Sequence, residues 1–283
     1  MKDLFNQYTS YVSNPHTKLQ YTYSFRIFND YLNLIDKDIE TITTEDVLNF
    51  TQWLKSKFNP STIKVRIGNI KTFFKWLEEF KGYKRVNWRL IPCHYKMQRR
   101  LTFLDHQELN SIRRCIKTNT FEGLRLRASF EFLLSTGCRL EEFISLRLSD
   151  INILNRTVCV KGKGGKYGTV YLNDKSITWL SKYLAQRTDD SDWLWVSQRQ
   201  GVKQLNYKVF QSQLLKLKEC SPVKKDWSAH TLRHSHATIM LKNGADIFTI
   251  KELLRHQNIN TTQIYLHITN LDLAKKHRKY LKV

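Results

Sequence analysis

Hydrophobic positions in residues 1–95 recur at three- and four-residue intervals, the spacing expected of amphipathic helices around one core. One such run begins at Tyr21, and a second follows the cap-like sequence Thr43-Thr44-Glu45. A third begins after Asn59-Pro60-Ser61, because proline is favoured in the first turn of a helix. Its apolar stripe consists of Ile63, Ile67, Ile70, Phe74 and Leu77. The pattern predicts a helical domain over residues 1–95.

A separate stripe on the third helix is basic. It contains Lys64, Lys71 and Lys75, which fall on one helical face. Such a face either follows a DNA backbone or is an ordinary solvated surface. The first alternative makes these lysines candidate DNA ligands.

The stretch from Lys81 to Arg100 has no sustained period. It contains Gly82 and Pro92 and ends in a basic run that includes Arg99. These features predict an interdomain linker, either a contributor of DNA contacts through Arg99 and Arg100 or a merely solvated tether.

Residues 96–283 combine helical and β-like patterns. Two β-like runs, Thr157 to Val160 and Thr169 to Leu172, flank a glycine- and lysine-rich connection and predict a hairpin. Upstream, Thr136-Gly137 breaks one helix and opens the next, which places Arg139 in a first helical turn and Glu142 one turn later. The predicted fold is mainly α with a small β-hairpin or sheet, in two domains that divide near residue 95.

The chain carries a formal net charge of +22, and 41% of its residues are hydrophobic. Residues 1–95 have a net charge of +5 and residues 96–283 a net charge of +17. A field of this sign attracts polyanions and indicates nucleic acid, although a basic architectural protein has the same property.

The five cysteines are odd in number and show no C-x-x-C spacing, which argues against a disulfide framework and against a zinc site. The chain shows no signal-peptide pattern and no long apolar run. We therefore expect a cytosolic protein with no metal ion and no membrane contact.

Two segments near the C-terminus combine histidine, arginine and tyrosine. The first begins at His230 and predicts a helix on which His230 and Arg233 share a face. The second contains His256 and places Tyr265 after a cap-like Asn260-Thr261-Thr262 run. The pattern suggests a tyrosine nucleophile prepared for a phosphate.

This set of residue types suits attack on a phosphodiester. Tyrosine has a pKa of about 10, so only about one phenol in a thousand is ionised at neutral pH. Histidine is the side chain suited to accept the proton, and arginine matches the phosphate oxygens bidentately. Lysine in a cationic neighbourhood can protonate the leaving oxygen, because nearby positive charge lowers its pKa.

Together, Arg139, the Gly-Lys-Gly hairpin, the H-x-L-R helix and the segment that contains Tyr265 resemble the tyrosine recombinases. These site-specific DNA recombinases include phage integrases and bacterial chromosome-dimer resolvases. The match spans about residues 100–270 in the family's order, and residues 1–95 are similar to its core-binding domain. The resemblance implies a helical core-binding domain followed by an α+β catalytic domain.

The resemblance also implies how charge is handled. Arg139 and Arg233 would clamp the scissile phosphate. Lys163, which matches the hairpin lysine of the family, would be the general acid for the 5′-oxygen, with Lys161 and Lys166 as alternatives. The latter two would otherwise contact DNA.

Four further residues match positions near the nucleophile. Tyr265 would attack and leave a 3′-phosphotyrosine and a free 5′-hydroxyl. His230 would assist proton transfer at this phenol, and His256 would hydrogen-bond the phosphate. Glu142 matches an acidic position that supports the site, whereas His236 is expected to pack.

The chain departs from the family pattern at three positions. The family usually has glycine before the second histidine, where this chain has Arg255. After the hairpin the family often has arginine and then proline, where this chain has Gly168 and Tyr171. These departures are the reason that the choice of lysine stays open.

The predicted function is site-specific recombination by a two-domain clamp on duplex DNA with an inverted-repeat core site, without a cofactor. The expected states are a monomer in solution and a dimer or tetramer on DNA, in the nucleoid. A type IB topoisomerase would relax supercoils without forming recombinant junctions, and a non-catalytic architectural protein would form no covalent adduct.

Overall fold

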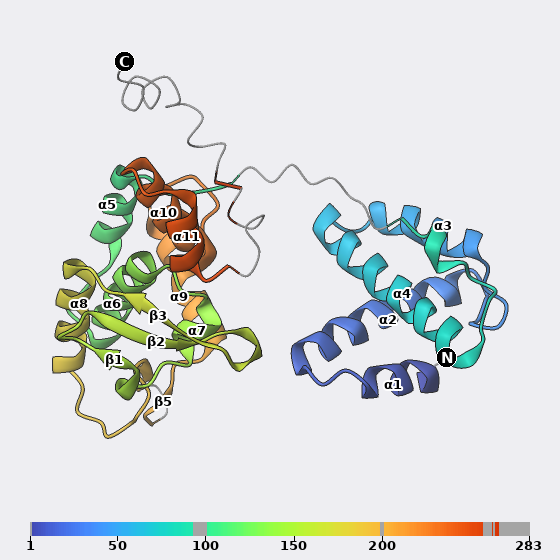
Figure 1. The fold of residues 1–283 in the computed structure, drawn as a ribbon, viewed down its shortest axis with the longest axis horizontal. Helices are drawn as coiled ribbons and strands as arrows, with labels where there is room; N and C mark the ends of the chain where they lie inside the picture. Colours follow the sequence, from blue (N-terminus) through green and yellow to red (C-terminus); the bar gives the residue numbers. More distant parts are fainter. Residues whose placement is uncertain (1, 93–100, 199–200, 257–261, 263, 266–283) are drawn as a thin grey trace, which may run out of the picture. The chain divides into compact units, whose positions relative to one another are not determined.

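The computed structural model describes residues 2–92, 101–198, 201–256, 262, 264 and 265 of the 283-residue chain. The chain forms two compact units, Met1–Arg99 and Arg100–Val283. Figure 1 shows the helices and strands of both units, and each unit has a hydrophobic core of its own. Within the described residues, no helix has the length and apolar character needed to cross a membrane.

The first unit is helical throughout its described part, as the pattern predicted. Thr43 begins one helix with a capping box to Asp46, and Asn59 caps another in which Pro60 is the first residue. The predicted apolar stripe on the latter is buried from Ile63 to Leu77. The helices are α1 (Lys2–Ser10), α2 (Pro15–Leu34), α3 (Thr44–Lys55) and α4 (Pro60–Lys81), followed by the 3-10 turn η1 (Trp88–Leu90).

The segment predicted to be a linker departs from that prediction in its first half. Gly82 ends α4 with a φ of +66°, but Val86 and Ile91 are then buried in the core of the first unit. The carbonyl of Ile91 also accepts a hydrogen bond from Lys71 Nζ at 2.9 Å. The prediction was wrong here because two isolated apolar residues in an irregular segment produce no periodic signal. Residues 93–100, which include Arg99 and Arg100, lie outside the described residues.

The second unit is built around α6 (Phe121–Thr136), which packs against α8 (Asp174–Ala185) and α10 (Ala229–Lys242). A three-stranded antiparallel sheet lies beside α6 and the short helix α7 (Leu140–Ile144) (Figure 1). Its strand order is β1 (Ile151–Asn152), β2 (Thr157–Lys161) and β3 (Tyr167–Tyr171). The other helices are α5 (His106–Cys115), α7 (Leu140–Ile144), α9 (Tyr207–Cys220) and α11 (Ile247–Leu254), and η2 is a 3-10 turn (Leu148–Asp150).

The predicted hairpin is confirmed. Val158 pairs with Val170 and Val160 pairs with Gly168, so these positions face the core while their neighbours face outward. The strands are β1 (Ile151–Asn152), β2 (Thr157–Lys161) and β3 (Tyr167–Tyr171), with the turn η3 (Lys163–Gly165) between the last two. A second sheet of β4 (Val196–Ser197) and β5 (Lys203–Gln204) was not predicted, because strands of two residues show no period.

Candidate active site

The site begins where α6 ends. Gly137 caps α6 with a φ of +58°, a conformation that favours glycine, and the chain then turns directly into α7. Arg139 occupies the N-cap of α7, one residue before the first helical turn in which the sequence placed it. Its Nη1 donates to Oε1 of Glu142 at 2.9 Å, and its backbone N–H donates to Oε2 at 2.8 Å. Glu142 is 3% exposed, so a buried carboxylate fixes the direction of a half-exposed guanidinium.

Arg233 reaches the same place from α10. Its Nη1 donates to the carbonyl of Gly137 at 2.5 Å, and its Nη2 donates to the carbonyl of Leu254 at 2.6 Å. Burial, reinforced by the positive charge of Arg139, lowers the pKa of Arg233 to about 10. The guanidinium is therefore still cationic at neutral pH, and two backbone carbonyls hold it in a fixed orientation before any substrate arrives.

The phenol of Tyr265 contacts His234. The Tyr265 hydroxyl lies 2.7 Å from Nδ1 of His234, and only 1% of the tyrosine is exposed. Burial raises the pKa of Tyr265 to about 12, and the charge of Arg233 opposes that shift. Burial, with the charges of His230 and Arg233, lowers the pKa of His234 to about 4. At neutral pH both groups are uncharged, and in the tautomer that carries its proton on Nε2 the imidazole Nδ1 accepts the phenolic hydrogen bond.

His234 was not singled out from the sequence. The available signal was its spacing, because His230 and His234 are four residues apart on one helix and share its face. The Tyr265 ring packs beside Ala237, Leu241 and other apolar residues of α10 and α11, which brings the nucleophile candidate next to the Arg233 helix within one chain.

The two predicted catalytic histidines occupy different environments. His230 keeps access to solvent at the first turn of α10, and partial burial and the charges of Arg233 and Arg139 lower its pKa. His256 is buried, and its Nδ1 lies 2.8 Å from the hydroxyl of Thr262. Burial and the same two arginines lower the pKa of His256 to about 4. Both histidines thus share one electrostatic neighbourhood with the arginine pair.

Other predictions near the site have mixed outcomes. His236 packs as predicted, with Nδ1 3.0 Å from the carbonyl oxygen of Leu134. Lys163 lies in the turn η3, but its side chain lies outside what the structure describes. Lys161 and Lys166 are exposed at the same turn. The choice among the three lysines therefore stays a prediction.

The predicted DNA-binding lysines on α4 differ in their exposure and in their contacts within the protein. Lys64 is exposed, whereas Lys71 donates to a backbone carbonyl and Lys75 lies 3.6 Å from Glu79 in an ion pair. Both Lys71 and Lys75 also lie near the ring of Trp88, at 5.8 and 5.7 Å. Their role in DNA binding remains a prediction.

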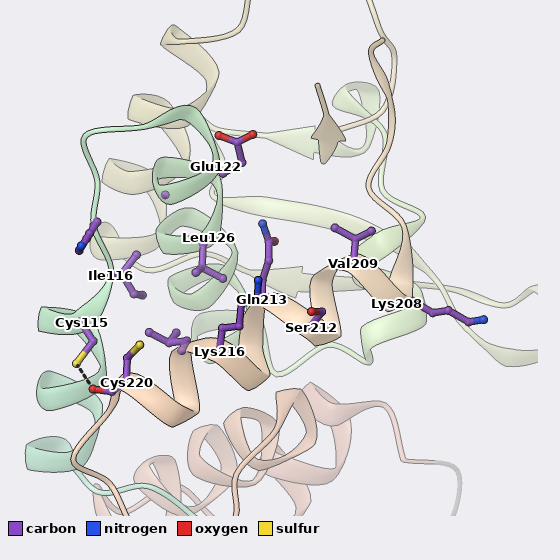
Figure 2. Close-up of a pocket in the computed structure, with 13 residues that line it drawn as sticks. Cys115, Ile116, Glu122, Leu126, Lys208, Val209, Ser212, Gln213, Lys216 and Cys220 are labelled. Carbon is purple, nitrogen blue, oxygen red and sulfur yellow. Dashed lines mark hydrogen bonds between the residues drawn. The ribbon is translucent and has the colours of Figure 1, made fainter. Parts of the chain in front are cut away.

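A cavity of about 520 Å³ lies between the end of α5, the start of α6 and α9 (Figure 2). Leu126 and Val209 contribute to its mostly apolar lining, and the thiol of Cys115 points toward the carbonyl of Cys220 at 3.5 Å. None of the residues predicted to act in catalysis lines it. This cavity is therefore separate from the predicted catalytic residues on α7 and α10.

The chain belongs to the phage integrase family, the tyrosine recombinases, which cleave DNA and exchange strands in site-specific recombination. The pattern of the Phage integrase family matches residues 102–271. That of the phage integrase N-terminal SAM-like domain matches residues 3–81. The topoisomerase and architectural alternatives are not favoured.

Named relatives agree with this assignment. Tyrosine recombinase XerD of Oceanobacillus iheyensis is 31% identical over 251 residues, which are 85% of this chain and 83% of the relative. Tyrosine recombinase XerC of the same organism is 28% identical and covers 98% of this chain and 94% of its own length.

Solved structures share the fold. The XerH recombinase in its post-cleavage complex with palindromic difH has a TM-score of 0.76 at 21% identity, covering 93% of this chain and 78% of that chain. A lambda integrase dimer on a COC′ core site has a TM-score of 0.75 at 16% identity, covering 94% of each chain.

Proposed function

We propose that Tyr265 is the nucleophile of this recombinase and that it attacks in the subunit to which it belongs. The observation that supports this most directly is the hydrogen bond between its hydroxyl and His234, the residue next to Arg233. In the attack, the Oη–P bond forms, the bond from phosphorus to the 5′-oxygen breaks, and the 3′-phosphate stays on the tyrosine. The free 5′-hydroxyl later reverses the step on a partner strand, so no high-energy cofactor is required to rejoin the DNA.

Arg139 and Arg233 would bind the two non-bridging oxygens of the scissile phosphate. Both guanidinium groups are oriented by internal acceptors, Glu142 for one and backbone carbonyls for the other. Donors that are already oriented stabilise the developing negative charge without reorganising during the step. His256 would donate to a phosphate oxygen from its free ring nitrogen, because Nδ1 is occupied by Thr262.

Two protons must move. The phenolic proton would pass to His234, whose Nδ1 lies within hydrogen-bond distance of the phenol, with His230 one helical turn away as the route toward solvent. A lysine of the hairpin would protonate the 5′-oxygen. Lys163 is the predicted residue, because it lies in the Gly-Lys-Gly turn. A cation delivered by a turn can approach the leaving group after DNA binds.

The substrate would be duplex DNA with an inverted-repeat core site, bound by a dimer or tetramer that assembles from monomers on the DNA in the cytoplasmic nucleoid. The XerH complex with a palindromic site and the lambda integrase dimer on a core site support this arrangement. The charge of +22 supports phosphate contacts by both units, with Lys64 as the exposed candidate on α4.

The test uses a nicked duplex that carries an inverted repeat from the DNA flanking the gene. The native chain should form a covalent adduct with the 3′-end that survives denaturation, whereas Tyr265→Phe should bind the duplex within about twofold of the native affinity and form no adduct. An adduct formed by Tyr265→Phe would assign the nucleophile elsewhere. Plasmids with two sites, relaxed without recombinant junctions, would contradict recombination itself.

A further inference from the structure

The residue between α11 and His256 has an uncommon backbone conformation. Arg255 adopts a φ of +52° and a ψ of +48°, in the left-handed region where an L side chain is disfavoured by roughly 1–2 kcal/mol. Glycine would adopt it without strain. The contacts of the Arg255 side chain must offset that strain.

Those contacts depend on a glycine in the neighbouring strand. Gly168 of β3 faces the protein, opposite Val160, and a Cβ atom at position 168 would lie 2.4 Å from Cδ of Arg255. That separation is too short for two carbon atoms. The arginine stem therefore occupies the space in which any side chain of residue 168 would begin.

The Arg255 guanidinium ends on the carboxylate that already holds Arg139. Its Nη2 pairs with Oε2 of Glu142, which accepts the backbone N–H of Arg139, while Nη1 of Arg139 pairs with Oε1. The same Oε1 lies 3.4 Å from where a Cβ of Gly162 would be, at the base of the hairpin turn. One buried carboxylate thus joins α7 to the end of α11 and lies close beside the base of the hairpin turn.

We propose that Arg255 is a positioning residue for strand cleavage. Its side chain holds Glu142 in place, and Glu142 in turn fixes Arg139 and the base of the β2–β3 hairpin relative to the segment that contains His256. The proposal rests on the proposed function of this site. Arginine suits the role because its rigid fork fixes a carboxylate in direction as well as in charge.

Stability alone does not account for this arrangement. Nη1 of Arg255 is buried and has no hydrogen-bond partner among the described residues. A buried donor without a partner destabilises a fold by about 1–3 kcal/mol, and the left-handed backbone adds to that. Glycine would remove both of these costs, and with them the ion pair with Glu142.

The geometry provides a reciprocal test. A side chain at position 168 would start where the stem of Arg255 now lies. The double variant Gly168→Arg/Arg255→Gly should therefore bring a guanidinium back to Glu142, this time from strand β3. Arg255→Gly alone should fold, because glycine suits the local φ. Arg255→Lys keeps the charge and removes the fork.

Cleavage of the nicked duplex is measured under single-turnover conditions with protein in excess, together with duplex affinity and the thermal unfolding midpoint. Arg255→Gly and Arg255→Lys should each slow cleavage by roughly tenfold to a hundredfold at saturating DNA, with affinity within about twofold, because a displaced phosphate clamp weakens the transition state more than binding. The double variant should recover most of the rate lost in Arg255→Gly.

Arg156→Gly is the matched control. Arg156 also has a left-handed backbone, with a φ of +56°, but its ion pair with Asp174 is exposed and includes no residue of the site. This variant should cleave at the native rate.

Native cleavage rates in Arg255→Gly at saturating DNA would overturn the proposal, as would a double variant no faster than Arg255→Gly. If the native chain itself forms no adduct, the proposed function fails instead. The adduct assay on the native chain therefore distinguishes the two failures.

Discussion

Replacing His234 tests the contact on which the assignment of the nucleophile depends. The Tyr265 hydroxyl is buried, and its 2.7 Å hydrogen bond to Nδ1 of His234 is removed in His234→Leu. A buried hydroxyl without a partner is destabilised by about 1–3 kcal/mol, equivalent to roughly 5- to 150-fold in the population of the docked tyrosine. Loss of a proton acceptor slows the chemical step by a further roughly 10²-fold or more. His234→Leu should therefore cleave at least roughly a hundredfold more slowly.

A second variant separates the two effects. In His234→Asn the side-chain amide oxygen can take the position of Nδ1, so the hydrogen bond is kept while proton acceptance is lost. Its cleavage rate should fall between those of the native chain and His234→Leu. The assay is single-turnover cleavage of the nicked duplex at saturating protein, with the exposed His106 replaced by Asn as a control that should cleave normally. A native rate in His234→Leu would refute both the contact and the proton route.

Three further predictions follow from the charges of the site. Glu142→Gln leaves Arg139 and Arg255 without their shared counter-charge. A loss of about 3 kcal/mol in the free energy of unfolding should lower the calorimetric unfolding midpoint of the second unit by roughly 6–12 °C. An unchanged midpoint would contradict the role of Glu142 as the carboxylate shared by both arginines. The pKa values of His234 and His256 are about 4 in the folded protein against 6.5 ordinarily, so the unfolded chain binds more protons between these two pH values. The free energy of unfolding, measured in denaturant, should therefore fall as the pH decreases from 6.5 to 4. A flat profile would count against buried neutral histidines. Duplex affinity should decrease steeply with salt because bound phosphates release counterions, whereas an affinity independent of salt would exclude the basic contacts.

Much of the fold could be predicted because its signals are local. The stripe from Ile63 to Leu77 has the period of a helix and is buried on one side. The hairpin follows from two alternating runs around a glycine-rich turn, and Arg139 and Glu142 are one helical turn apart, so their ion pair was implied by spacing. Each of these features depends on residues close together in the chain.

The remaining features depend on contacts that sequence order does not reveal. Tyr265 and His234 are joined by a hydrogen bond between α10 and a residue that follows α11 in the chain, so spacing within α10 could suggest His234 but not its partner. Gly168 and Arg255 were noticed only as separate departures from a family pattern. The two departures are related because the side chain of Arg255 packs across β3 at Gly168, and this contact is visible only in the three-dimensional structure.

The charges also bear on when the proposed nucleophile would form. In the free protein, proton transfer from Tyr265 to His234 would run from a pKa of about 12 to one of about 4, a difference on the order of 10 kcal/mol. A phosphodiester between Arg139 and Arg233 offsets the positive charge that helps keep the histidine pKa low, although its own negative charge also disfavours a phenolate. Only the forming Oη–P bond removes the basicity of the phenolic oxygen. Under the proposed function, proton transfer would therefore accompany attack, and no reactive phenolate would form until a phosphate is in place.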